Sequence, residues 1–243
     1  MGLESLVLAA IGFVGALIFG ITGFGSALVT IPLATHLVPL PFALALFAVS
    51  DLACAFAVGL EKPKNAVRGE WTRLLPMILV GTALGVTLLV HLPRGAAMGL
   101  LGAFVVSYAI YSLVRHAPAK TVRPAWAWVA GLCGGITSTL FGAGGPPYAI
   151  YLSHRGLTKE QFRATMGFAT MTSISLRVIA FVLTGLLLDS RVWLTAIAVI
   201  PGALAGIYVA RHLFLKISRE ALMRAVALIL LVSGGSLLVR ALG

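Results

Sequence analysis

The sequence carries very little charge for its length. Charged residues make up 10% of its 243 residues, whereas hydrophobic residues make up 60% and the mean hydropathy is +1.04. Because a soluble domain keeps about a quarter of its residues charged, a soluble fold is excluded for most of the chain. A helix that spans a bilayer needs about 20 apolar residues, and several uncharged stretches reach or approach that length. The sequence therefore predicts an all-α, polytopic membrane protein surrounded by the lipid bilayer.

Acidic residues are the scarcest charged type. There are 7 of them against 18 basic residues, which leaves a net charge of +11. The basic residues lie in short loops between apolar segments, where they are typical of the positive-inside rule and of contact with anionic headgroups. We therefore expect no nucleic-acid partner.

Cysteines are almost absent, and so is the basic start of a cleaved signal peptide. Cys54 and Cys133 both fall in apolar helical sequence, which argues against a disulfide framework and predicts buried thiols. The stretch MGLESLVLAAIGFVGALIFG has no basic region before its apolar part. We expect it to belong to the mature membrane domain.

What the sequence does contain is eight hydrophobic segments joined by short connections. They cover residues 3–35, 40–60, 72–91, 95–115, 125–153, 160–188, 191–211 and 220–242. An offset of 119 residues lays the second half on the first and aligns Gly23 with Gly142, Gly25 with Gly144, Leu33 with Leu152, and Ala45 with Ala164. In each half a long segment broken by glycines precedes three ordinary segments. This order predicts two transmembrane repeats, residues 1–118 and 119–243, within one integrated membrane domain.

The distribution of basic residues favours an unusual topology. If all eight segments cross once, the two sides hold nine and eight basic loop residues, which is no bias. If both glycine-broken segments are re-entrant hairpins, fourteen lie on one side and three, Arg94, Arg191 and Arg240, on the other. The positive-inside rule favours this second arrangement, with both termini outside. It leaves three spanning helices per half, and this odd number makes the halves inverted repeats. The alternative is that each broken segment crosses the membrane once with a kink.

The glycine clusters themselves, TGFGSALVTIPL at 22–33 and FGAGGPPYAIYL at 141–152, suggest a binding site. A helix break at bilayer depth frees backbone groups that protein must bury or water must reach. A helix that begins after the break, near Ser26 in the first half and near Pro147–Tyr148 in the second, directs its positive dipole end inward and can bind an anion. The alternative is that these small residues serve close helix packing.

Two ionisable residues lie deep in apolar segments. Asp51 is near the middle of 40–60 and Arg177 near the middle of 160–188, and such residues usually face a polar interior or a partner. Because their segments correspond under the duplication, the two side chains could approach each other. Either they form a structural ion pair, or Arg177 binds the anion with its fork of donors while Asp51 pairs transiently or carries a proton.

The candidate substrate site combines both breaks with nearby polar side chains. Its expected residues are Gly23, Phe24, Gly25, Ser26, Thr30, Gly142, Ala143, Gly144, Gly145, Tyr148, Ser173 and Arg177. Asp51 is the candidate for coupling to protons or other ions. No cofactor and no metal are expected.

The stretches GITGFGSALVTIPL and GITSTLFGAGGPPYAIYL, one opening each half, resemble the twin glycine-rich signatures of the TauE/SafE family of membrane transporters. The resemblance extends over the chain in length, segment order and duplication. It implies a small anionic substrate containing sulfur, such as sulfite or an organosulfonate, exported across the bacterial cytoplasmic membrane. The family's motif has consecutive glycines followed by proline and leucine. Gly23, Gly25, Pro32 and Leu33 match it in the first half and Gly142, Gly144 and Gly145 in the second, whereas Phe24 breaks the glycine run and Tyr151 replaces the second proline.

Three classes of function can be weighed on these residues. No nucleotide-binding motif is present, so a transporter would be a secondary one. An intramembrane enzyme would need paired aspartates, a Ser–His arrangement or a metal site, and one deep aspartate without a deep histidine argues against it. A passive anion channel stays open, because duplicated hairpins suit channels as well as carriers.

Overall fold

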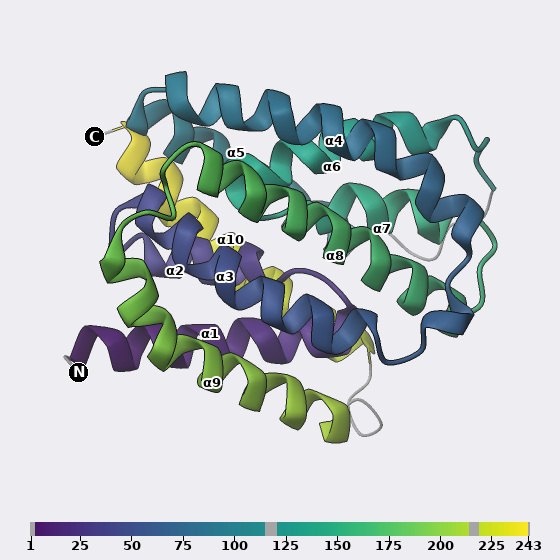
Figure 1. Ribbon diagram of the computed structural model, residues 1–243, viewed down its shortest axis with the longest axis horizontal. Coiled ribbons are helices and arrows are strands. Elements are labelled where there is room, and N and C mark those ends of the chain that lie inside the picture. Colours follow the sequence, from purple (N-terminus) through teal and green to yellow (C-terminus); the bar gives the residue numbers. More distant parts are fainter. Residues whose placement is uncertain (1–2, 115–120, 214–218, 243) are drawn as a thin grey trace.

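The computed structural model describes residues 3–114, 121–213 and 219–242, and all regular elements in these ranges are helices. Figure 1 shows their arrangement. The helices are α1 (Leu3–Thr22), α2 (Ser26–Ala34), α3 (Leu40–Gly59), the short η1 (Pro63–Asn65), α4 (Arg68–His91), α5 (Arg94–Val114), α6 (Trp126–Phe141), α7 (Gly145–Ser153), α8 (Lys159–Leu183), α9 (Ser190–Leu213) and α10 (Arg219–Leu242). The all-helical class is confirmed.

The eight hydrophobic segments correspond to helices or helix pairs, with two corrected boundaries. α4 begins at Arg68 rather than at 72, because its first turn is polar and the backbone N–H of Val67 is held by Thr165 Oγ1 at 2.9 Å. α8 ends at Leu183 rather than at 188, because Gly185 turns the chain with a φ of 81°.

Four helix pairs build the bundle. α1 packs along α9, α4 along α6, α5 along α10, and α3 against α8. Figure 1 shows α4 and α6 along one long edge, α1 and α9 along the other, and α3 and α8 between them. The middle position of α3 explains why most of its residues are buried.

Small residues let the paired helices approach closely. A Cβ at Gly81 of α4 would lie 2.4 Å from the carbonyl oxygen of Leu132 in α6, and a Cβ at Gly206 of α9 would lie 2.4 Å from that of Phe13 in α1. Such contacts are typical of membrane helices, which pack through small residues because lipid supplies no hydrophobic force between them.

The same packing corrects the expectation for one thiol. Gly131 and Gly135 face α4, so Cys133, about 200° around the helix from each, points outward and is exposed, whereas Cys54 is buried as expected. Both thiols are free.

Both broken segments return to the end of the bundle at which they begin. At one end a single cavity is lined by Glu4 in the first turn of α1, Val38 after α2, and Asp189 between α8 and α9. At the other end the N–H of Val122, before α6, donates to the carbonyl of His154, after α7, at 3.1 Å. α1–α2 and α6–α7 are therefore hairpins that enter from opposite ends (Figure 1).

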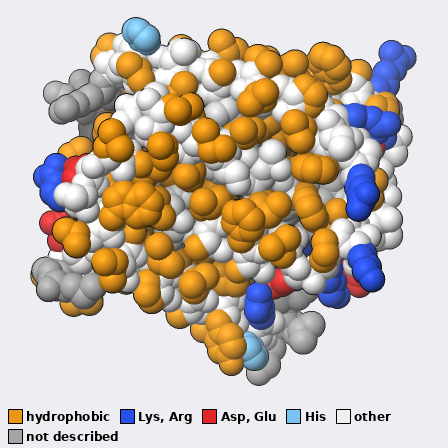
Figure 2. All heavy atoms as spheres, viewed as in Figure 1, with side chains coloured by type: hydrophobic (Ala, Val, Ile, Leu, Met, Phe, Trp, Pro, Cys, Tyr) orange, Lys and Arg blue, Asp and Glu red, His pale blue; other side chains and the backbone are white. Residues whose placement is uncertain are grey.

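The second of these ends carries most of the described basic loop residues, and we call it the basic end. Ion pairs join loops to helices at this end: Glu61, after α3, pairs with Arg163 of α8 and Arg211 of α9, and Arg155, after α7, pairs with Glu70 of α4. Figure 2 shows Lys and Arg side chains gathered at this end, and hydrophobic side chains across the middle of the visible face.

By length and composition, six described helices could cross a membrane: α1, α3, α4, α5, α8 and α9. α1 is among them, so the first arm of the first hairpin is itself as long as a span, while its second arm, α2, has 9 residues. The side chains of α10 are only partly described, and its described apolar part covers Leu230–Val239.

Candidate functional site

Glycines with left-handed backbone make both helix breaks. Gly23 and Gly25 have φ values of 82° and 93°, and Gly142 has 72°. Such values strain residues that carry a Cβ. α2 begins at Ser26 as expected, but α7 begins at Gly145 rather than near Pro147–Tyr148. The earlier start places the two prolines in the first turn, where a missing N–H leaves no hydrogen bond unmade.

The two breaks meet inside the bundle. A Cβ at Gly145 would lie 2.5 Å from the Cβ of Phe24, and one at Gly142 would lie 2.7 Å from the Cβ of Ala27. Only glycine permits this approach of one hairpin tip to the other. The N-terminal ends of α2 and α7, with their free backbone N–H groups, therefore converge on the same place.

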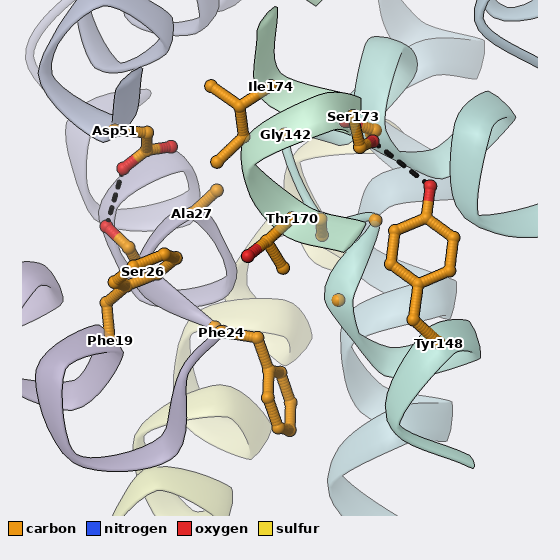
Figure 3. Close-up of a pocket in the computed structure, with 15 residues that line it drawn as sticks. Phe19, Phe24, Ser26, Ala27, Asp51, Gly142, Tyr148, Thr170, Ser173 and Ile174 are labelled. Carbon is orange, nitrogen blue, oxygen red and sulfur yellow. Dashed lines mark hydrogen bonds between the residues drawn. The ribbon is translucent and has the colours of Figure 1, made fainter. Parts of the chain in front are cut away.

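A small cavity lies at this meeting point (Figure 3). The volume that the centre of a water molecule can occupy in it is about 20 Å³. This is enough for a single water but too small for a substrate anion. Its lining comes from both breaks and from α1, α3, α6 and α8. The lining residues are Phe19, Phe24, Gly25, Ser26, Ala27, Asp51, Ser138, Gly142, Ala143, Gly144, Gly145, Tyr148, Thr170, Ser173 and Ile174.

Asp51 and Arg177 form a buried ion pair beside the cavity. Arg177 Nη2 lies 3.1 Å from Asp51 Oδ2, and the two residues are 1% and 3% exposed. Asp51 Oδ1 accepts a hydrogen bond of 2.8 Å from Ser26 Oγ, and Arg177 Nη1 donates to the carbonyl oxygen of Ser138 at 3.3 Å. The expected approach of these two residues is confirmed, and the pair joins α2, α3, α6 and α8.

One donor nitrogen of Arg177 makes no hydrogen bond to a described residue. Within the described part of the chain, its buried Nε has no hydrogen-bond partner. A buried donor without an acceptor costs free energy, so the guanidinium retains a capacity for one more acceptor.

A second hydrogen bond crosses the other side of the cavity. The hydroxyl of Tyr148, in α7, donates to Ser173 Oγ in α8 at 3.0 Å. Figure 3 shows this bond opposite the Ser26–Asp51 bond, with Thr170 between them. Tyr148 is fully buried because Gly134 leaves space for its ring, where a Cβ would lie 2.0 Å from a ring carbon.

Most of the expected site residues lie together, but three do not line the cavity. Gly23 shapes the first break but does not line the cavity, and Thr30 is fully buried against Gly15 of α1. Arg177 does not line the cavity either, but it pairs with Asp51, which does. The expectation missed five lining residues: Phe19, Ala27, Ser138, Thr170 and Ile174. Thr170 carried a usable signal, since it follows Asp51 by the repeat offset of 119 and shares a helix face with Ser173 and Arg177.

A second polar cluster, at the basic end, was not expected from the sequence. Glu70, in the first turn of α4, is 5% exposed and accepts hydrogen bonds from Arg73 and Arg155, and from the hydroxyl of Tyr151. Arg155 also donates to the carbonyl oxygen of Val122 at 2.6 Å. The hydrogen bond to Glu70 raises the pKa of the Arg155 guanidinium above its ordinary value. This cluster fastens both ends of the second hairpin to α4.

The fold and the site together define a multi-pass membrane protein with two broken hairpins meeting at a buried polar site. Residues 8–237 match the family described as Sulfite exporter TauE/SafE. The chain belongs to this family, and is therefore a membrane transporter rather than an enzyme. The expected resemblance is confirmed.

One curated relative supports the same class. The chain is 25% identical over 165 residues to the "Probable inner membrane transporter protein TsaS" of Comamonas testosteroni, an alignment that covers 68% of this chain and 69% of that protein. No solved structure matches the chain.

Proposed function

We propose that this chain is a secondary transporter that moves a small sulfur-containing anion, such as sulfite or a sulfonate, across the cytoplasmic membrane. The observation that carries the proposal is the convergence of the starts of α2 and α7 on one buried polar cavity. Helix N-termini favour negative charge and offer unpaired N–H donors. The family description and the name of the relative support a sulfur anion and an inner-membrane location.

Alternating access would follow from two inverted repeats, residues 1–118 and 119–243. The helix pairs support this symmetry: α1 packs on α9 as α6 packs on α4, while α3 and α5 each pack on their own counterparts, α8 and α10. A two-fold axis between the halves would produce this exchange. The hairpins entering from opposite ends support its orientation in the membrane plane.

The size of the cavity supports a carrier over a passive channel. A channel conducts through a continuous path, whereas this cavity, which Phe24, Asp51 and Tyr148 help to line, has room for one water. In this conformation the cavity would be too small for the substrate. Substrate would enter when one repeat moves against the other and widens the cavity.

Arg177 would supply the fixed positive charge of the site. It is the charged partner of Asp51, its Nε is free, and it stands directly behind the cavity lining. A planar guanidinium binds tetrahedral and trigonal oxyanions with two donors at once.

Counterflow of labelled sulfite in proteoliposomes tests this function. We expect saturable exchange that is lost in Arg177→Ala and retained in Arg191→Ala, because Arg191 lies at the surface with a side chain that is 79% exposed. Arg177→Lys, which keeps the charge but not the fork, should retain part of the exchange. Flux that rises linearly with concentration in the wild type would indicate a passive channel, and unchanged exchange in Arg177→Ala would remove Arg177 from the site.

A further inference from the structure

The carboxylate of Asp51 already holds the groups that a substrate anion would use. Its Oδ1 accepts from the hydroxyl of Ser26, the first residue of α2, at 2.8 Å, and its Oδ2 lies 3.1 Å from Arg177 Nη2. Groups at a helix start and guanidinium groups are donors that commonly bind oxyanions in proteins. Because Asp51 also lines the cavity (Figure 3), it acts as an internal anion at the proposed site.

One buried cation cannot balance two buried anions. With Asp51 ionised, the pair is neutral and fully enclosed. A monoanion added beside it would leave one uncompensated negative charge away from water, which is strongly unfavourable. Two carboxylate-like charges that share a site do not both stay ionised. A proton on Asp51 removes the conflict.

Among the described residues, Arg177 is the cation that forms an ion pair with Asp51 and acts on its charge. The charged side chain that acts on it from α8 is Arg177, α2 contributes the hydroxyl of Ser26, and its own helix contributes the thiol of Cys54. The apolar cluster around Cys54 includes Ala16 and Phe19 of α1 and Ala203 and Ile207 of α9. Asp51 is therefore the group in this environment that can take up a proton.

We propose, on the basis of the function proposed above, that Asp51 and the substrate anion compete for Arg177, so that the anion binds only when Asp51 is protonated. The proton forms an O–H bond with one carboxylate oxygen and makes the side chain neutral. Arg177 Nη2 and the Ser26 hydroxyl are then free to donate to the anion. A monoanion and one proton cross together without net charge, and the empty carrier returns with the Asp51–Arg177 pair restored.

Binding of ethanesulfonate to the purified full chain tests this competition, because a sulfonate keeps the same charge across the pH range. Isothermal titration calorimetry between about pH 5 and pH 9 should show a wild-type Kd that rises about tenfold per pH unit once Asp51 is ionised. Asp51→Asn should bind at all these pH values with a constant Kd. Asp189→Asn is the matched control. Asp189 lies outside the spans, and hydrogen bonds from Arg191 lower the pKa of its carboxyl, so this carboxyl takes up no proton on substrate binding. The Asp189→Asn variant should therefore keep the wild-type pH dependence.

A measurement on the wild type alone covers the case in which Asp51→Asn does not fold. Titrations in buffers of different ionisation enthalpy report proton uptake, and we expect one proton for each sulfonate bound. Binding without proton uptake and without pH dependence would overturn the competition and leave the transport function standing. If neither ethanesulfonate nor sulfite binds the wild type at any pH, the proposed function fails, and this inference with it.

Discussion

Arg155, which follows the second hairpin, donates from Nη2 to Glu70 Oε1 in the first turn of α4 across 2.9 Å. The two residues come from different halves of the sequence, and the hydroxyl of Tyr151 binds the same carboxylate. Tyr151 stands where the family motif has proline, at the position equivalent to Pro32. The departure from the motif thus has a structural role in this chain, because the hydroxyl that proline lacks fastens α7 to α4.

Replacing Glu70 tests how much this cluster stabilises the basic end. Glu70→Gln should lower the free energy of unfolding by about 1–3 kcal/mol, because it replaces the buried carboxylate, whose side chain is 7% exposed, by a weaker acceptor for the partly exposed Arg155. Thermal unfolding in detergent measures the change. Glu61→Gln is the control, since Glu61 also pairs with two arginines but its side chain is 26% exposed, and surface pairs contribute little. Equal losses in both variants would contradict a special role for Glu70.

Gly25 is needed both for the turn and for the site. With a φ of 93°, Gly25→Ala should cost about 1–2 kcal/mol in backbone strain and should also abolish sulfite counterflow by shifting the start of α2. Gly185→Ala is the matched control, because Gly185 has a φ of 81° in the connection between α8 and α9, where it lines the cavity at the end of the bundle and not the polar cavity between the two breaks. We expect both variants to lose similar stability, but only Gly25→Ala to lose transport. If both variants lose transport equally, backbone strain alone explains the effect.

Close packing of α1 on α9 depends on Gly206. Gly206→Ala would place a Cβ 2.4 Å from the carbonyl oxygen of Phe13, whereas nothing lies within 4 Å of a Cβ at Gly235 in α10. We expect the first variant to lose about 1–3 kcal/mol through overpacking. The second should be unchanged or gain up to about 1 kcal/mol from helix propensity. Thermal unfolding of both variants in the same detergent measures these changes. A Gly206→Ala variant as stable as the wild type would show that close packing of α1 on α9 does not depend on Gly206.

The hairpin topology predicts which loops share a side of the membrane. In a background without Cys54 and Cys133, thiol reagents that do not cross membranes should label Lys64→Cys and Lys159→Cys from one side. Leu188→Cys, at the opposite end of the bundle, should react from the other side. Labelling of Lys64→Cys and Lys159→Cys from different sides would exclude the second hairpin as re-entrant.

The class, the helical segments and the family could be predicted from the residues alone. Apolar length set the helical segments, since a bilayer leaves backbone groups no partner outside the helix. The glycine clusters located both breaks, because few other residues tolerate a left-handed turn. Charge distribution pointed to two hairpins, and burial cost singled out Asp51 and Arg177 as groups that need a partner.

How these parts meet depends on the packing of the helices, which the residues alone did not predict. Periodicity along one helix contains no information on which helix packs against it, so the cavity residues Ser138, Thr170 and Ile174 could not be assigned from spacing alone. The Glu70 cluster joins residues that are 81 and 85 positions apart, and no local pattern predicts such a contact. The structure also placed Asp51 between Arg177 and Ser26, because helices α2, α3 and α8 converge there, and that position turns a possible ion pair into a candidate competitor of the substrate.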